Sequence, residues 1–307
     1  EVGSSVLWPS TRIYTDFRFG QHLHLLLTDT RTHRPDHLVP EDAFPGEIVV
    51  DEATLRQILG DAAFEQVRAS FDPYIDFSLW GAVLPIFRHT ATLVVAQAYQ
   101  LENPALSVDE ALAIARDRLD GQLVSTTFLN AAWQAAGWPP PFGAQVLGSA
   151  PRGLSNLLMG KTSMYGAFGS RNILLWDTFQ IYAAARWLAT AGAAQDLFGP
   201  TQNAWLAGSL VTSQATWRVL ASSVMATPLL VDFTNPQIAA LLPPEFPDAL
   251  RTRLLLTADQ WDGFPQKRME LLGTLAFVPN SVIISGDIHA TFVTDHGGGV
   301  FEFTGPA

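Results

Sequence analysis

The sequence predicts an α/β fold, because apolar segments of strand length alternate along the chain with segments that have helical periodicity. Apolar runs at residues 23–27, 217–225 and 281–285 have the length and composition of buried strands. The segments between these runs repeat their apolar residues at helical spacing. The resulting order of strand, helices, strand, helix and strand is that of an α/β protein.

The composition indicates a compact globular protein that carries excess negative charge. Of the 307 residues, 48% are hydrophobic and 15% are charged, and the length suits one large domain or two ordinary ones. The formal net charge of −11 argues against a nucleic-acid or anionic-membrane surface, since both require a basic footprint. A phosphate-ester substrate would therefore need bound metal cations to hold its charge. The absence of cysteine excludes disulfides and thiolate metal sites within this chain.

The first half of the chain predicts one strand followed by a helical region. The segment "FRFGQHLHLLLTDTR" is apolar from Leu23 to Leu27 and ends in polar residues, which is typical of a strand with a polar carboxyl end. From about residue 40 to 169, helical spacing dominates, notably in 51–71 and 107–137. Ser107 followed three residues later by Glu110 predicts a capping box.

The second half predicts alternating helices and strands. Residues 172–192 fit a helix that ends at Gly192, and residues 200–225 fit a helix, a turn and a strand. A polar loop at 259–265 leads into another helix, and residues 281–293 fit a strand, a loop and a second strand. The apolar stretch 79–101 is interrupted by charged and polar residues, so we expect no transmembrane segment.

The segment "SVIISGDIHAT" at 281–291 places Asp287 and His289 just beyond a strand. If the backbone remains extended, residues i and i+2 point to the same side, and a carboxylate oxygen and an imidazole nitrogen could converge on one cation. Such ligands suit calcium, iron, manganese or zinc. The alternative is that Asp287 caps a turn and His289 packs against its neighbours.

Two further segments place carboxylates beside loops that follow apolar runs. They are "DTR" at 29–31 and "DQWDG" at 259–263. A phosphate site needs such groups as ligands or to orient ligands. For "DQWDG", the alternative is an ordinary Asp-Gly turn with a packed Trp261. For "DTR", it is a turn at Asp29 or an ion pair between Asp29 and Arg31.

Four segments together, 14–31, 198–225, 259–272 and 281–291, resemble the PhoD-type alkaline phosphatase and phosphodiesterase family of the metallophosphoesterase superfamily. The resemblance covers about residues 12–34 and 196–304. It implies a four-layer α/β/β/α metallophosphoesterase sandwich with a mainly helical inserted cap. Residues 1–45 and 190–307 would form the core, incomplete at both ends, and residues 46–189 the helical insertion or cap.

The resemblance also implies a function, a metal centre and a location. The expected function is that of a metal-dependent phosphoester hydrolase, an alkaline phosphatase or phosphodiesterase with a metal-activated water or oxo nucleophile. Its cofactors would be iron and calcium, or other divalent metals. Asp287 and His289 would be metal ligands, and Asp259, Trp261 and Asp262 would line the catalytic site. The family implies a secreted or periplasmic bacterial protein.

The family's remaining ligand motifs, of the "GD" and "DDH" kind, do not occur in this sequence. We therefore expect a missing N-terminal part of the same protein to complete the metal site. The alternative is a non-catalytic or degenerate metallophosphoesterase-like module with a binding or structural role, because the chain alone lacks enough ligands for a dinuclear centre.

Overall fold

The structure is a computed structural model that describes residues 12–306, so residues 1–11 of the predicted core segment 1–45 lie outside the described residues. The fold is mixed α/β and divides into two compact units. Unit 1 comprises the described parts of Glu1–Leu38, Trp187–Leu229 and Ala258–Ala307. Unit 2 comprises Val39–Arg186 and Leu230–Thr257, so most of it lies between the first two segments of unit 1 in the chain.

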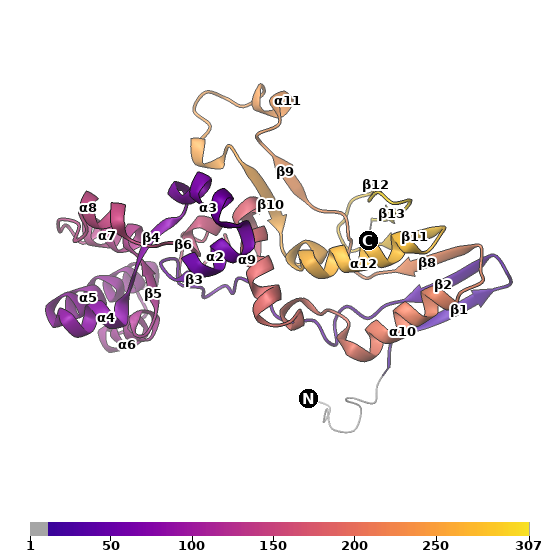
Figure 1. The fold of residues 1–307 in the computed structure, drawn as a ribbon, viewed down its shortest axis with the longest axis horizontal. Coiled ribbons are helices and arrows are strands. Elements are labelled where there is room, and N and C mark those ends of the chain that lie inside the picture. Colours follow the sequence, from indigo (N-terminus) through magenta and orange to yellow (C-terminus); the bar gives the residue numbers. More distant parts are fainter. Residues whose placement is uncertain (1–11, 307) are drawn as a thin grey trace. The chain divides into compact units, whose positions relative to one another are not determined.

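Unit 1 contains one sheet and two long helices (Figure 1). Its elements are β1 (Thr15–Phe19), β2 (Leu23–Leu27), α10 (Gly199–Thr212), β8 (Trp217–Ala221), α12 (Pro265–Phe277), β11 (Ser281–Ser285), β12 (Phe292–Asp295) and β13 (Phe301–Thr304).

Unit 2 contains most of the helices and two small sheets. Its elements are β3 (Ile48–Val50), α2 (Glu52–Leu59), α3 (Asp61–Val67), β4 (Asp72–Asp76), α4 (Phe77–Val83), α5 (Pro85–Glu102), α6 (Val108–Leu119), β5 (Leu123–Ser125), α7 (Thr126–Ala135), α8 (Ala144–Ser149), β6 (Arg152–Ser155), β7 (Asn172–Leu175), α9 (Trp176–Ala189, whose residues up to Arg186 belong to this unit), β9 (Leu230–Asp232), α11 (Pro236–Ala239) and β10 (Arg253–Thr257).

The six-stranded sheet of unit 1 has the order β1-β2-β8-β11-β13-β12. The four inner strands run parallel, and β1 and β12 are antiparallel edge strands. The apolar runs at 23–27 and 281–285 are strands with the predicted bounds, whereas the strand predicted at 217–225 ends at Ala221. The single strand expected in the first segment is instead a hairpin, because Gly20 turns the chain with a φ of 59° between β1 and β2.

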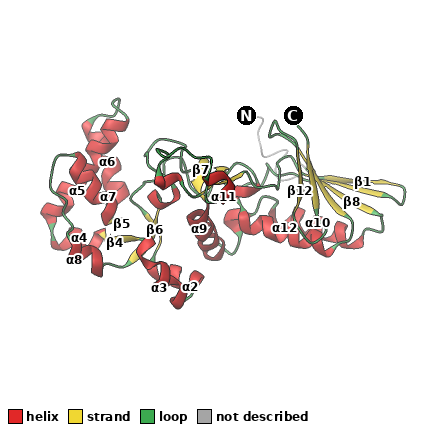
Figure 2. Ribbon diagram, turned by 90° about the horizontal axis from the view of Figure 1, so that it is seen from above, coloured by secondary structure: helices red, strands yellow, loops and turns green. Residues whose placement is uncertain are grey.

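Helices α10 and α12 cover one face of this sheet (Figure 2). Leu206, Leu210, Leu271 and Leu275 from the two helices pack with inward residues of the strands in one buried cluster. The strand residues of that cluster are Leu26, Leu220 and Ile283. Burial of these side chains is the main stabilising contribution to unit 1.

The opposite face of the same sheet is also apolar, yet its side chains are not buried. The strand register places on this face Phe17, Phe19, Leu23, Leu25, Leu27, Trp217, Val219, Ala221, Val282, Ile284, Val293, Phe301 and Phe303. Every one of them is exposed or half-buried. We call this surface the open sheet face. A contiguous apolar surface of this extent marks a place where another structure packs.

Unit 2 confirms some helical predictions and corrects others. Ser107 and Glu110 form the predicted capping box at the start of α6. The region from about residue 40 to 169 also contains a four-stranded sheet, β3-β6-β4-β5, which the helical periodicity did not indicate. Its strands have only three to five residues, too few to establish a period of their own.

A second sheet in unit 2, β7-β10-β9, changes two further predictions. The first four residues of the helix predicted at 172–192 form β7, and the helix α9 begins at Trp176. Residues 230–257, which the sequence analysis placed in the core, lie in unit 2 because β10 pairs with β7 and β9 there. Among residues 12–306, no helix is both long and apolar enough to cross a membrane.

Candidate functional site

The carboxyl ends of the parallel strands in unit 1 form one polar edge of the sheet, which we call the strand-end edge. The segments that follow β2, β8 and β11 are 28–31, 222–223 and 286–289. Because the three strands are parallel and adjacent, these segments lie along the same edge. In open α/β sheets, ligands bind beyond the carboxyl ends of the strands.

Asp29 shapes the loop that follows β2. Its Oδ1 accepts hydrogen bonds from the backbone N–H groups of Arg31 and Thr32 at 2.9 and 3.0 Å. Its own backbone N–H and carbonyl pair with the side chain of Gln202 on α10, both at 2.8 Å. Partial burial alone would raise the pKa of Asp29, but the hydrogen bonds from this turn and the nearby His33 hold the pKa below its usual value. Asp29 therefore caps a turn, which is one of the two alternatives that the sequence left open.

The three loops of the strand-end edge are linked by side chains. The hydroxyl groups of Thr30 and Ser223 lie 2.5 Å apart and join the loops after β2 and β8. The Arg31 guanidinium lies 3.7 Å from the Asp287 carboxylate and joins the loops after β2 and β11. Both members of that ion pair are about 60% exposed, at 60% and 61%, so the pair contributes little to stability and both groups remain accessible.

Asp287 and His289 lie on the loop after β11, but the backbone there is not extended. Asp287 has a φ of 72° and His289 a φ of 57°, both in the left-handed region, and both side chains are exposed. The prediction that an extended backbone sends residues 287 and 289 to the same side is therefore wrong, because β11 ends at Ser285. Non-glycine residues with positive φ are strained, and such strain is concentrated at functional sites. Only five non-glycine residues among the described residues have it, and these are two of them.

Asp287 and His289 are suitable types of metal ligand, but two ligands are too few to hold a metal ion. A carboxylate oxygen and an imidazole nitrogen are common donors to iron, calcium and zinc. Within residues 12–306, however, no group of three or more histidine, aspartate or glutamate residues is arranged to hold an ion. The described residues thus supply two donors, and any metal centre at this edge needs others.

Asp259 lies in the loop after β10 and is held by two basic side chains. Its Oδ1 accepts hydrogen bonds from Arg34 Nη2 and from His37 Nε2, both at 2.9 Å. Burial alone would raise the pKa of Asp259, but His37 and Arg34 outweigh it and hold the pKa below the usual value. The carboxylate is about half exposed, at 49%, so solvent reaches this charged cluster.

Trp261 does not line a cleft, because its side chain is fully buried. Its ring packs edge-on against Phe198 with 5.3 Å between centroids. Its indole Nε1 donates to Ser222 Oγ at 3.2 Å, and Ser222 Oγ donates to the carbonyl of Val224 at 2.6 Å. The packed tryptophan foreseen as the alternative for "DQWDG" is what the structure contains. Its link to the site is indirect, through the loop after β8.

Glu302 on β13 is the centre of a buried network that the sequence analysis missed. Its fully buried carboxylate accepts four hydrogen bonds: from Ala226 N–H at 2.9 Å, Thr227 Oγ1 at 2.6 Å, Ser285 Oγ at 2.6 Å and His296 Nε2 at 3.0 Å. Burial alone would raise the pKa of Glu302, but these hydrogen bonds outweigh it and lower the pKa. The network joins the end of β11, just before the Asp287 loop, to the loop after β8.

Asp262 lies beside this network and is almost completely buried. Its Oδ2 accepts a hydrogen bond from Leu229 N–H at 2.8 Å, while Oδ1 has no hydrogen-bond partner among the described residues. Burial raises the pKa of Asp262 to about 7, against the opposing effects of the Leu229 hydrogen bond and the Arg268 charge. A carboxyl group with an unpaired buried oxygen is more stable protonated than ionised.

Asp262 should therefore give unit 1 a measurable dependence of stability on pH. Its pKa is higher in the folded protein than the usual 3.8, so the folded state binds the extra proton and stability falls as the pH rises from about 4 to about 7. In Asp262→Asn, we expect this slope to be reduced by up to about 1.4 kcal/mol per pH unit. Urea unfolding between pH 4 and pH 8 measures it. The exposed Asp295→Asn is the control, and an unchanged slope in Asp262→Asn would contradict the assignment.

Comparison with known proteins finds similarity in the second half of the chain, which includes the loops after β8 and β11. A solved structure described as "Structure of PhoD" is 23% identical, with a TM-score of 0.28, and the match covers 36% of this chain and 20% of that chain. No curated protein matches the sequence. The model of a family described as PhoD-like phosphatase matches residues 176–306, which include β8, α12, β11 and β13. The part of the chain that contains Asp259, Asp287 and His289 is therefore similar to the PhoD-like phosphatase family.

Proposed function

We propose that the protein is a phosphoester hydrolase, an alkaline phosphatase or phosphodiesterase, whose reaction takes place at the strand-end edge of unit 1. The observation that carries the proposal is the family match over residues 176–306, which include two of the three loops of this edge, 222–223 and 286–289. The left-handed backbone of Asp287 and His289 supports it, because two chemically suited residues share an unusual conformation at the expected position.

The side chains of the strand-end edge would bind and orient the phosphate ester. Arg31 is exposed and only loosely paired with Asp287, so its guanidinium is free to take phosphoryl oxygens in a bidentate manner. Arg34 is mostly buried and its charge is balanced by Asp259, to which it is bound, so Arg31 is the cation left to contact the ester. It offsets negative charge in a chain whose formal net charge is −11.

Asp287 and His289 would be the donors that this chain contributes to a metal centre, which we propose to contain iron and calcium. Such a centre, when bound, supplies an activated water or oxo nucleophile. The described residues provide two donors only, so the proposal includes further ligands from elsewhere in the same protein. Glu302 and Asp29 would hold the loops on either side of these donors in place.

The open sheet face supports a more specific proposal for the fold, a four-layer α/β/β/α sandwich. In such a fold, each sheet has helices on one face and the other sheet on its second face. Unit 1 shows this pattern for one sheet: α10 and α12 bury one face, and the register-matched apolar face opposite is uncovered. We propose that a second sheet of the same protein packs there and brings the remaining metal ligands.

A charge placed on the open sheet face tests this proposal. Phe303 is 48% exposed on β13, opposite Ile284 of β11. If a second sheet covers it in the natural protein, Phe303→Glu should lower the free energy of unfolding by about 3 kcal/mol or more, because a carboxylate would be buried among hydrocarbon. Urea denaturation measures this. A change below about 0.5 kcal/mol, typical of a surface position, would contradict the packing of a second sheet.

The second candidate function is a non-catalytic binding or structural module of metallophosphoesterase type. The observation that favours it is the incomplete donor set among the described residues.

Export of the protein to the periplasm or medium is a proposal that rests on the family alone.

Turnover and metal content distinguish the two candidates. The purified natural protein should release nitrophenol from nitrophenyl phosphate or bis-nitrophenyl phosphate, and it should contain iron or calcium near stoichiometry. Dialysis against a chelator should remove the activity, and added metal should restore it. Metal-free protein that binds neither ester nor ion would refute the hydrolase and leave the structural module.

A further inference from the structure

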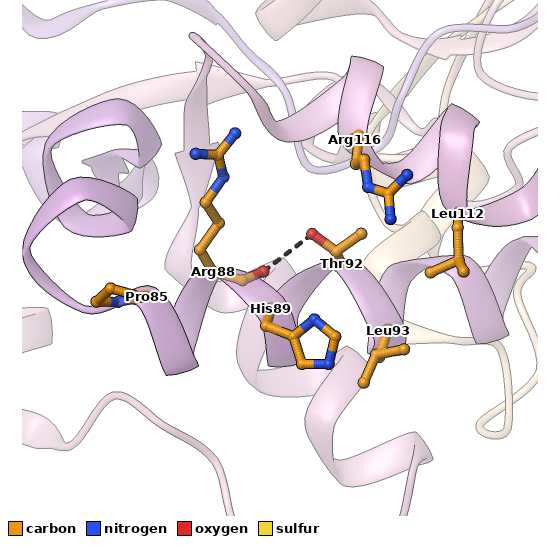
Figure 3. Close-up of a pocket in the computed structure, with 7 residues that line it drawn as sticks. All are labelled: Pro85, Arg88, His89, Thr92, Leu93, Leu112 and Arg116. Carbon is orange, nitrogen blue, oxygen red and sulfur yellow. Dashed lines mark hydrogen bonds between the residues drawn. The ribbon is translucent and has the colours of Figure 1, made fainter.

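We propose that a groove between α5 and α6 of unit 2 binds a phosphate-bearing small molecule with an apolar group, a site that the proposed hydrolase reaction does not use. The groove has a volume of about 490 Å³, within the range of small-molecule sites. Figure 3 shows the residues that line it, which are Pro85, Arg88, His89, Thr92, Leu93, Leu112 and Arg116.

Helical periodicity explains why these residues meet. Arg88 and Thr92 are four residues apart on α5, and Leu112 and Arg116 are four apart on α6, so each pair lies on one face of its helix. The two helices pack closely through buried residues such as Val95 and Ala115. The side chains of the two facing stripes therefore line one groove, and Figure 3 shows both guanidinium groups on the same side of α5.

The groove gathers positive charge in a chain that is strongly acidic. Arg88 is paired with Asp120 at 2.5 Å. Within residues 12–306, neither Arg116 nor His89 has a carboxylate partner, and both are exposed. The hydroxyl of Thr92 donates to the carbonyl of Arg88 at 2.9 Å. The groups available to a ligand are thus the unpaired Arg116 guanidinium and the His89 imidazole, beside the paired Arg88, and a guanidinium suits a phosphate group.

The rest of the groove is apolar. Pro85, Leu93 and Leu112 line it, and Leu93 is 40% exposed. Leu84, directly before Pro85, belongs to a second hollow of about 290 Å³ formed by Leu79, Trp80, Val83 and Leu84. A ligand that carries hydrocarbon next to its phosphate would cover this exposed apolar surface, which inorganic phosphate alone would leave in water.

The test is calorimetric titration of the protein with hexyl phosphate, inorganic phosphate and hexanol. We expect hexyl phosphate to bind saturably, and inorganic phosphate and hexanol to bind at least about tenfold more weakly, because each offers only half of the contacts. Vesicles of phosphatidylcholine with phosphatidic acid present the same chemistry on a membrane. Competition between these vesicles and hexyl phosphate shows that the groove also takes a lipid headgroup, and absence of competition assigns it to soluble ligands.

Arg116→Ala should weaken hexyl phosphate binding by about tenfold or more, the effect of losing a charge-assisted hydrogen bond. Arg116→Lys should have an intermediate effect. The matched control is Arg171→Ala, which removes an exposed guanidinium of the same unit that pairs with Glu41 outside the groove. It should change binding by less than about twofold.

Two kinds of result would overturn the site. One is the absence of saturable hexyl phosphate binding, or binding that Arg116→Ala leaves unchanged. The other is binding that is lost in Arg31→Ala but kept in Arg116→Ala, which would place the ligand at the strand-end edge of unit 1. The titration is done on protein dialysed against a chelator, because hexyl phosphate is itself a phosphoester that the proposed hydrolase would cleave. The readout is then binding alone, and the site succeeds or fails whether or not the protein hydrolyses esters.

Discussion

Replacing Glu302 by alanine is expected to lower the free energy of unfolding of unit 1 by about 3–5 kcal/mol. The carboxylate is fully buried and accepts four hydrogen bonds, from Ala226, Thr227, Ser285 and His296. Its loss removes the shared acceptor of these four buried donors and opens a cavity, and both effects are destabilising. Urea unfolding measures the change in the free energy of unfolding. Hydrogen exchange at the backbone amides of β11 and β13 assigns that change to unit 1.

Glu302→Gln is the matched variant. It keeps the size of the side chain and one acceptor oxygen, so it should cost less than Glu302→Ala. Phe301→Ala on the same strand is a second comparison, since Phe301 lies on the open sheet face with no hydrogen bonds to lose. A cost for Glu302→Ala no larger than about 1 kcal/mol would show that the network contributes little and would contradict its role in holding the two loops.

Asp287→Ala and His289→Ala should each reduce phosphoester hydrolysis by at least about a hundredfold, if these residues bind the metal centre as proposed. Stability should hardly change, because both side chains are exposed and the Arg31 ion pair of Asp287 is long and solvated. Steady-state kinetics with nitrophenyl phosphate esters, together with the metal content of each variant, measure the effect.

The matched control is Asp295→Ala. Asp295 is an exposed aspartate at the opposite edge of the same sheet, where its Oδ1 accepts a hydrogen bond from Gly297 N–H at 2.8 Å. This variant should keep full turnover. Normal turnover in both Asp287→Ala and His289→Ala would remove these residues from the site and require another location for the reaction.

The framework of unit 1 was predictable because its inner strands are long apolar runs with clear ends. Residues 23–27 and 281–285 satisfy the simplest criterion for a buried strand, and their bounds are those of β2 and β11. Ser107 and Glu110 fixed the start of α6 through local hydrogen bonds alone. Where local chemistry decides the conformation, the sequence is enough.

The Glu302 network was not predictable, because alternation does not reveal which face of a strand is inside. In β13, the pattern Phe301, Glu302, Phe303 suggests phenylalanines in the core and a solvated glutamate. The structure reverses this, with Glu302 buried under the helices and both phenylalanines on the open sheet face. The buried carboxylate is favourable because of its hydrogen bonds, some of which come from residues distant in sequence such as Ser285 and Ala226.

The conformation of the Asp287 loop was mispredicted for a similar reason. The prediction for residues 287 and 289 assumed an extended backbone, but the strand ends at Ser285. The positive φ angles of Asp287 and His289 have only a weak sequence signal, since aspartate and histidine adopt them more often than most non-glycine residues but still rarely. Likewise, the family resemblance implied that Trp261 lines the catalytic site, whereas its large ring is buried against Phe198.

The most direct test of the proposed hydrolase is anomalous X-ray scattering from crystals of the natural protein at the iron edge. We predict an anomalous difference peak for iron within coordination distance of both the Asp287 carboxylate and the His289 imidazole. The peak should lie at the carboxyl ends of β2, β8 and β11. A peak bound elsewhere, or an active enzyme with no metal at these two side chains, would contradict the account.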